Sequence, residues 1–226
     1  MLSTKVPWTI KTVLSVHILR FIMGLVLVRL LYPLFFTVDS FTAEMTDRIV
    51  VILIVWWVVH KHGFSFSQLG LSTEQLGKNL IWGIGAGFLL LAVSVYSERL
   101  YSAVLLLTPT QHPLVEQVQK AFSWYQLAIP LLLAGIMAPV AEEVLYRLFT
   151  FLPMKDQWGI WGGAAASSLV FALMHFNLYW LGEIMVVGFG LALLYYWSGS
   201  LVSAMVVHSI INTTKILMIF FGIPIV

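Results

Sequence analysis

The sequence has no cysteine and few charged residues among its 226 positions. Without cysteine, the chain can form no disulfide and has no thiolate to act as a nucleophile or a metal ligand. Asp, Glu, Lys and Arg together make up 10% of the residues, whereas about 25% is usual in soluble domains. The net charge is only +2 and the basic residues do not cluster, so we expect no nucleic-acid partner.

Apolar residues, in contrast, are abundant, at 60% of the chain. A water-soluble fold of this length could not bury so much apolar surface, so we expect the lipid bilayer to be its solvent. Apolar runs of about 18 or more residues predict about seven membrane spans. The second run is short, and Glu98 and Arg99 interrupt the third. The patterns therefore fit about six to eight spans. The predicted spans are residues 12–36, 46–60, 79–107, 125–153, 158–176, 179–198 and 200–224.

These spans predict an all-α fold, because helices satisfy every backbone hydrogen bond within the bilayer. Lys5 and Lys11 precede the first run. That run is much longer than the apolar core of a signal peptide, so we expect it to remain as a span. We therefore predict a polytopic membrane helical bundle that forms a single domain over residues 1–226 and lies in the cell membrane as a multi-pass protein.

The most informative charges lie in the fourth predicted span, residues 125–153. Glu142, Glu143 and Arg147 all fall within this apolar run. A charged side chain at the centre of a spanning helix costs about 2.5–3.5 kcal/mol on insertion scales. Charges retained inside a membrane segment therefore indicate a functional site.

Helical geometry separates the two glutamates. Glu143 and Arg147 are i and i+4, so they lie on one helix face and can pair, which offsets much of the cost of burying both charges. Glu142 points about 100° away and has no ion partner in its own helix. An unpaired carboxylate in an apolar environment suits proton transfer near neutral pH. Pro139, which precedes them, removes a backbone donor, kinks the helix and frees a carbonyl nearby.

Two later spans carry further polar residues. His175 shares a helix face with Phe171, and His208 shares one with Asn212, because each pair has the i, i+4 spacing. Three helices could therefore direct Glu142 and these polar side chains into one cavity. A histidine, an asparagine or a Glu–Arg pair in a membrane helix is by itself often a packing feature. Packing alone is a poor explanation for all of them together.

The order of the three motifs resembles that of the CPBP family, also called the Abi or CAAX-protease-like family. The motifs are EExxxR at residues 142–147, FxxxH at 171–175 and HxxxN at 208–212. The resemblance covers residues 125–215, which we predict to be the catalytic core, whereas residues 1–124 share only their hydrophobicity. It implies an intramembrane endopeptidase whose substrate is a peptide or protein segment that reaches the site from the membrane.

The resemblance also implies which residues would perform the reaction. Glu142 would act as general base, together with His175, to activate a water molecule. His208 and Asn212 would hold the oxyanion of the tetrahedral intermediate.

The remaining motif residues would support the site. Glu143 and Arg147 would brace the helix that carries the base, and Phe171 would be a further structural support. Every residue of the signature is present, so nothing in it points to an inactive enzyme.

The residues leave the need for a metal open. Glu142, His175 and His208 also form a His₂Glu set, a known pattern for catalytic zinc. The helical HExxH signature is absent from the sequence, and a glutamate-activated water needs no metal. We therefore expect no cofactor, with a zinc-dependent version of the same peptidase as the alternative.

Two functions of other classes fit the same residues. The chain could be a non-catalytic membrane scaffold or a bacteriocin self-immunity factor that keeps the polar cluster only for folding. It could also be a small transporter with Glu142 and His175 as a proton relay, although the sequence shows no inverted repeat.

Overall fold

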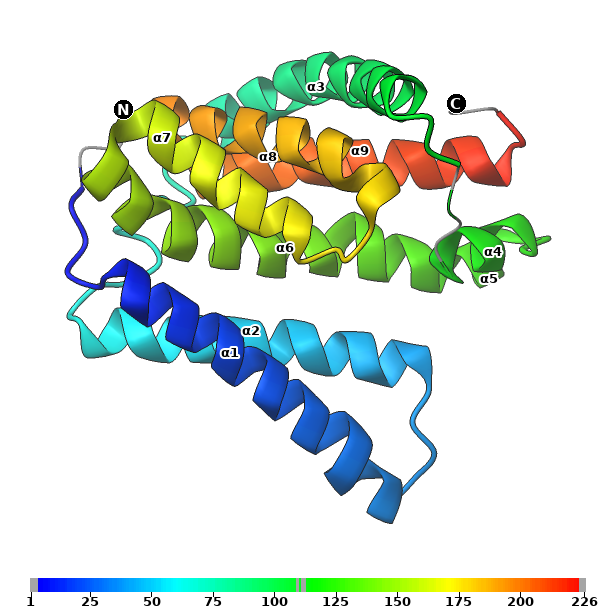
Figure 1. The fold of residues 1–226 in the computed structure, drawn as a ribbon, viewed down its shortest axis with the longest axis horizontal. Helices are drawn as coiled ribbons and strands as arrows, with labels where there is room; N and C mark the ends of the chain where they lie inside the picture. Colours follow the sequence, from blue (N-terminus) through cyan, green and yellow to red (C-terminus); the bar gives the residue numbers. More distant parts are fainter. Residues whose placement is uncertain (1–3, 109, 111–112, 224–226) are drawn as a thin grey trace.

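The computed structural model describes residues 4–108, 110 and 113–223, and all regular secondary structure in these residues is helical. Most helices run along the long axis of the molecule (Figure 1). The predicted all-α fold is therefore confirmed. The helices are α1 (Ile10–Leu25), α2 (Ser40–Lys61), α3 (Leu76–Val104), α4 (Pro113–Gln119), α5 (Trp124–Pro130), α6 (Ala138–Glu143), α7 (Leu152–Leu173), α8 (Leu178–Ser198) and α9 (Leu201–Phe220).

Three π-helical segments interrupt or extend these helices. The first, η1 (Val26–Leu31), prolongs α1 and leads into a short 3₁₀ turn. The other two, η3 (Leu131–Met137) and η4 (Val144–Phe151), lie on either side of α6. The helix that carries the EExxxR motif is thus π-helical before the motif and through its second half, and such π-helical segments occur frequently at functional sites.

Helices long and apolar enough to cross a membrane account for most of the predicted spans. The five stretches found in the described residues are Ile10–Leu34, Leu76–Val104, Trp124–Leu173, Leu178–Ser198 and Leu201–Phe220. Six of the seven predicted spans lie within or overlap these five stretches. The remaining span, residues 46–60, lies in α2, which carries Glu44, Asp47 and Arg48 and falls outside this group on composition. The five stretches support a multi-pass membrane protein.

The longest of these stretches, Trp124–Leu173, contains two predicted spans that are folded back on each other. The chain turns at Gly159, whose φ of 72° and ψ of 177° are not helical. The limb with α5 and α6 runs one way, and most of α7 returns alongside it (Figure 1). The sequence placed this break just before residue 158, and the structure places it at the glycine, whose lack of a side chain permits the positive φ.

The core lies between α6 with η4 and the helices around them. In Figure 1, α1 and α2 lie on one side of α6, and α7, α8, α9 and α3 lie on the other. Trp8, ahead of α1, donates a 3.0 Å hydrogen bond from Nε1 to the carbonyl of Phe149. His17 of α1 lies 3.2 Å from the hydroxyl of Thr150. The N-terminal helices are therefore packed against the limb that carries the motif. The predicted division at residues 124 and 125 stays a prediction.

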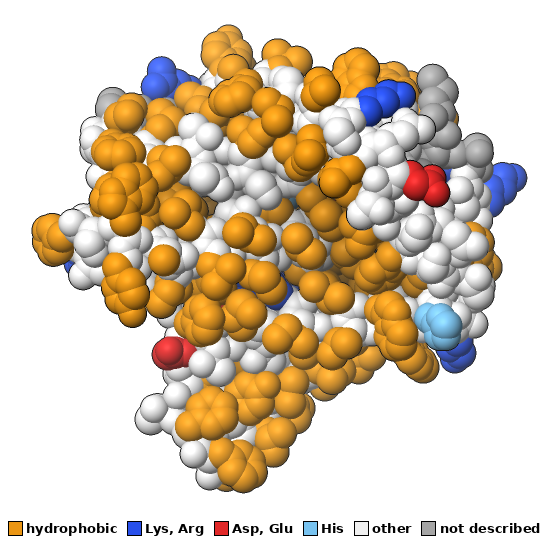
Figure 2. All heavy atoms as spheres, turned by 180° about the vertical axis from the view of Figure 1, so that it is seen from behind, with side chains coloured by type: hydrophobic (Ala, Val, Ile, Leu, Met, Phe, Trp, Pro, Cys, Tyr) orange, Lys and Arg blue, Asp and Glu red, His pale blue; other side chains and the backbone are white. Residues whose placement is uncertain are grey.

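Much of the outer surface is apolar, as expected of a lipid-facing protein. Figure 2 shows hydrophobic side chains spread over most of one face, including the projecting end of α1 and η1. Leu30, Leu34 and Phe35 at that end are all exposed. In water such a surface would favour association, whereas in a bilayer it is matched by the acyl chains.

Candidate active site

The EExxxR motif spans the junction of α6 and η4. The predicted pair forms: Glu143 Oε2 lies 3.1 Å from Arg147 Nε, and both side chains are fully buried. The guanidinium carbon of Arg147 also lies 4.7 Å from the centre of the Phe171 ring, a cation–π contact that further offsets burial of the charge. The bracing role inferred for this pair stays a prediction.

Glu143 has a second partner that the sequence did not indicate. Its Oε1 lies 2.9 Å from Nδ1 of His208 on α9. Because a carboxylate accepts, His208 carries a proton on Nδ1. One buried carboxylate therefore holds both the cation of its own helix and the imidazole of a distant one, and the two motifs meet.

Glu142 lies on the other side of the same imidazole. Its Oε2 is 3.8 Å from His208 Nε2, and its side chain is 27% exposed, whereas that of Glu143 is not exposed at all. Among the described residues, Glu142 makes no shorter polar contact. The expectation that Glu142 lacks an ion partner in its own helix therefore agrees with the structure, and the two adjacent glutamates have clearly different environments.

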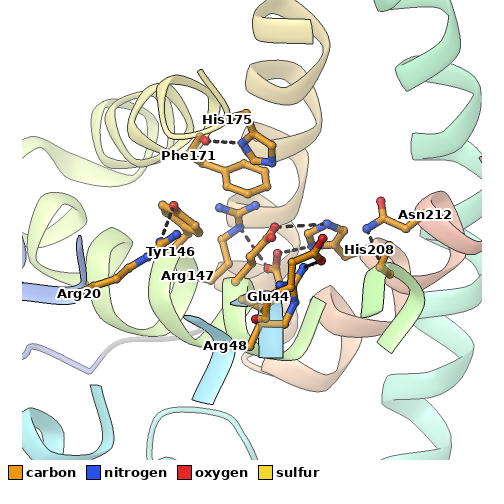
Figure 3. A network of polar contacts seen from close by, with 12 residues as sticks. Arg20, Glu44, Arg48, Tyr146, Arg147, Phe171, His175, His208 and Asn212 are labelled. Carbon is orange, nitrogen blue, oxygen red and sulfur yellow. Dashed lines mark hydrogen bonds and ion pairs between the residues drawn. The ribbon is translucent and has the colours of Figure 1, made fainter. Parts of the chain in front are cut away.

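Phe171 lies at the centre of the site, on α7. Its ring centre is 4.9 Å from that of His175, 6.0 Å from that of His208 and 4.8 Å from that of Tyr146. Figure 3 shows the Phe171 side chain between His175 and Arg147, with His208 to one side. Since Phe171 is buried, it fixes the spacing of the charged and imidazole groups around it.

His175 lies at the end of α7, where the chain turns towards α8. Its Nδ1 is 2.8 Å from the carbonyl oxygen of Phe171, so Nδ1 is the donor and Nε2 is free to accept. The turn follows directly: Phe176 has a φ of 50°, and the Asn177 side chain caps α8 by accepting from the backbone of Tyr179 and Trp180. His175 is exposed, in contrast to His208.

Asn212 reaches the motif-carrying limb from α9. Its Nδ2 donates a 2.8 Å hydrogen bond to the carbonyl oxygen of Ala134 in η3. Among the described residues this is the one hydrogen bond of its side chain. His208 and Asn212 approach from the same side in Figure 3, as their spacing on one helix face predicts.

The predicted site residues are therefore brought into one region, but not all into contact. Glu142 and Glu143 both lie beside His208. No ion pair or hydrogen bond joins Glu142 to His175 within the part of the chain that the structure describes. Phe171 separates the rings of His175 and His208, so a small molecule or substrate would have to bridge them.

The N-terminal helices contribute polar residues that the motif analysis missed. Arg20 of α1 binds Asp47 of α2, with Nε 3.0 Å from Oδ1, and its Nη1 donates to the hydroxyl of Tyr146 at 3.3 Å. On α2, Glu44 and Arg48 form a 3.1 Å ion pair in the same polar region (Figure 3). An arginine inside the first predicted span was the available signal.

A second buried cluster lies away from the motifs, where α3, α8 and α9 meet. Lys215 Nζ lies 3.1 Å from Glu98 Oε2 and 2.7 Å from Glu183 Oε1. The hydroxyl of Ser94 donates to the same oxygen of Glu183. Glu183 and Lys215 both fall within predicted spans, so the rule that flagged Glu142 would have found them.

The ligand set proposed for zinc is not assembled. Among the described residues, no three His, Asp or Glu side chains are arranged to hold a metal ion. Glu142 and His208 are neighbours, but the ring of Phe171 separates His175 from His208. This geometry does not fit a His₂Glu centre, and no step below runs through a metal.

Fold and site together define a polytopic membrane protein with a buried carboxylate and imidazole centre. Residues 124–214 match the model of a family described as type II CAAX prenyl endopeptidase Rce1-like. A protein named "Putative membrane peptidase YdiL", from Bacillus subtilis (strain 168), is 23% identical over 172 residues, which cover 75% of this chain and 67% of that protein. No solved structure matches significantly.

The two matches agree with the resemblance seen in the motifs. They support the CPBP, or CAAX-protease-like, family for the segment that carries these motifs. One match is described as an endopeptidase family and the other is named as a putative membrane peptidase, and together they support membrane peptidase activity.

Proposed function

We propose that this protein is an intramembrane endopeptidase that hydrolyses a peptide bond with a water activated by Glu142. The observation that carries the proposal is the contrast between the two adjacent glutamates. Glu143 is fully buried and engaged by Arg147 and His208, whereas Glu142 is partly exposed and lies 3.8 Å from Nε2 of His208. A carboxylate that is accessible, close to an imidazole and otherwise unpaired is suited to general base catalysis.

In the proposed reaction, Glu142 takes a proton from water and the hydroxide adds to the carbonyl carbon of the peptide. The tetrahedral intermediate then collapses, the C–N bond breaks, and the leaving amine receives the proton held by Glu142. His175 would orient the water through Nε2, which its Nδ1 hydrogen bond to Phe171 leaves free to accept.

His208 and Asn212 would stabilise the oxyanion. Nδ1 of His208 is taken by Glu143, so its Nε2 can donate only when the ring carries both protons. The carboxylates of Glu142 and Glu143 lie on either side of the ring. Removal of an oxyanion donor of this kind lowers kcat by about 10²–10³.

The substrate we propose is a peptide or protein segment that enters from the membrane. The surface around the bundle is apolar (Figure 2), and His175 at the end of α7 is exposed. A segment lying at or within the lipid could therefore reach the site without crossing an aqueous phase. We propose the cell membrane as its location.

The test compares membranes that contain wild-type protein, Glu142→Gln and the control Glu116→Gln. Glu116 is exposed on α4 and paired with Lys120, so its replacement should not affect catalysis. We expect new peptide termini with wild-type protein and with Glu116→Gln, and none with Glu142→Gln. If Glu142→Gln retains the same termini, the glutamate mechanism is wrong. If it retains the biological activity without any cleavage, the scaffold or immunity function is favoured.

A further inference from the structure

The side-chain amide of Asn212 donates to a backbone carbonyl that would normally accept a hydrogen bond within its own helix. Nδ2 of Asn212 lies 2.8 Å from the oxygen of Ala134. Ala134 belongs to η3. A carbonyl inside a helix ordinarily accepts from the N–H one turn later, so its availability to a side chain requires an explanation.

The explanation lies in Pro139 and in the π-helical winding of η3. At the end of this segment the N–H of Ala138 bonds to the carbonyl of Leu133, the i to i−5 register of a π-helix. The next N–H in that register would come from residue 139 and would bond to Ala134. Proline has no N–H, so the carbonyl of Ala134 has no helical donor. A part-buried carbonyl of this kind needs another partner, and Asn212 supplies it.

Close approach of α9 makes this hydrogen bond possible. Gly135 follows Ala134, and a Cβ built on it would lie 2.7 Å from Oγ1 of Thr213, the neighbour of Asn212. Real Cβ atoms are essentially never so close to another heavy atom. Glycine at this position therefore lets α9 lie near enough for the Asn212 side chain to reach the freed carbonyl.

We propose that Pro139 is a positioning residue that orients Asn212 as an oxyanion donor. An acceptor carbonyl must face the NH₂ end of the amide, so the bond to Ala134 fixes which end of Asn212 points towards η3. One Nδ2–H is used in this bond, and the other is free to donate to the substrate. This inference rests on the proposed function of Asn212, and it adds the device that holds its side chain in place before substrate binds.

The first experiment replaces Pro139 by alanine. Pro139→Ala restores an N–H that competes for the Ala134 carbonyl and should release Asn212. We expect kcat to fall about tenfold or more, within the 10²–10³ limit set by complete loss of a donor, with little change in KM. The melting temperature should hold or rise, because alanine restores a helical hydrogen bond. A merely structural proline would instead lose stability and activity together.

Pro130→Ala is the matched control, because Pro130 lies in the same limb and its replacement leaves the Ala134 carbonyl without a new donor. It should leave kcat within about twofold of wild type. Adding Pro139→Ala to Asn212→Ala should cause no further loss, since the residue being positioned is already gone. An additive loss in the double variant, or an unchanged kcat in Pro139→Ala, would overturn the inference.

A second measurement does not depend on activity. The chain has three asparagines, Asn79, Asn177 and Asn212, so selective ¹⁵N labelling gives three pairs of side-chain amide signals, and Asn212→Ala identifies the pair of Asn212. We expect slow hydrogen exchange for one Nδ2 proton of Asn212 in wild type and a clear shift of this signal in Pro139→Ala. Fast exchange in wild type would overturn the inference. If Asn212→Ala cleaves normally while the signal behaves as expected, the oxyanion role fails and the hydrogen bond stands.

Discussion

Glu143 and His208 are joined by a 2.9 Å hydrogen bond between Oε1 and Nδ1, although they lie on different helices, α6 and α9. The other oxygen of Glu143 lies 3.1 Å from Nε of Arg147. One carboxylate therefore connects a cation and an imidazole at the centre of the bundle. Its loss would affect both stability and the proposed chemistry.

The first prediction concerns this carboxylate. Glu143→Ala leaves the buried Arg147 without its partner, and Arg147→Ala does the same to Glu143. Removing one partner of a buried ion pair typically costs about 3–5 kcal/mol. We expect both variants to unfold at lower temperature in detergent and to lose cleavage. Glu116→Ala, at an exposed ion pair on α4, is the control and should melt as wild type does. Unchanged melting of both core variants would refute the bracing role.

The second prediction concerns the link between the N-terminal helices and the site. Tyr146→Phe removes the hydroxyl that accepts from Arg20 and keeps the ring packed 4.8 Å from that of Phe171. We expect a loss of about 0.5–1.5 kcal/mol in stability, as for a typical hydrogen bond. Asp47→Asn should cost more, because it removes the charge that pairs with the part-buried Arg20. Chemical unfolding in detergent measures both, and the reverse order would contradict the assignment.

The third prediction concerns the cluster of Glu98, Glu183 and Lys215. Lys215→Met leaves two carboxylates close together without a cation and should destabilise the protein by about 3–5 kcal/mol. Glu98→Gln in the same chain removes one of those charges, so the double variant should recover part of the loss. Lys78→Met, at an exposed lysine, should have no effect. A double variant less stable than Lys215→Met would show that the carboxylates do not repel each other.

The fourth prediction concerns metal. The proposed reaction uses protein groups and water, so cleavage should persist after treatment with a strong chelator. Elemental analysis of the purified active protein should give well under one zinc per chain. Loss of activity on chelation, with recovery on addition of zinc alone, would favour the zinc-dependent alternative with Glu142, His175 and His208 as ligands.

The parts of the site that were predictable depend on geometry within one helix. The i, i+4 spacing places Glu143 beside Arg147 and Phe171 beside His175 whatever the rest of the fold does, and both contacts are present. The all-α membrane fold was predictable for a similar reason, because apolar run length and backbone satisfaction leave few alternatives.

Contacts between helices were not predictable from spacing. The bond from His208 to Glu143, rather than to Glu142 alone, depends on how α9 is rotated against α6. The bond from Asn212 to Ala134 depends on the winding of η3. The sequence did indicate that Pro139 frees a carbonyl nearby, but not which residue would use it. Glu183 and Lys215 belong to none of the three motifs and lie on different helices, so spacing within one helix did not indicate their contact.

The turn at Gly159 has a consequence for how the chain enters the membrane. Its φ of 72° and ψ of 177° lie in a region that is essentially restricted to glycine. A straight continuation of this run would greatly exceed the roughly 30 Å hydrocarbon thickness. This one glycine therefore determines the direction in which each later helix crosses the membrane. If it failed to reverse the chain, the segments bearing both histidines would insert with inverted orientation, and no active centre could assemble.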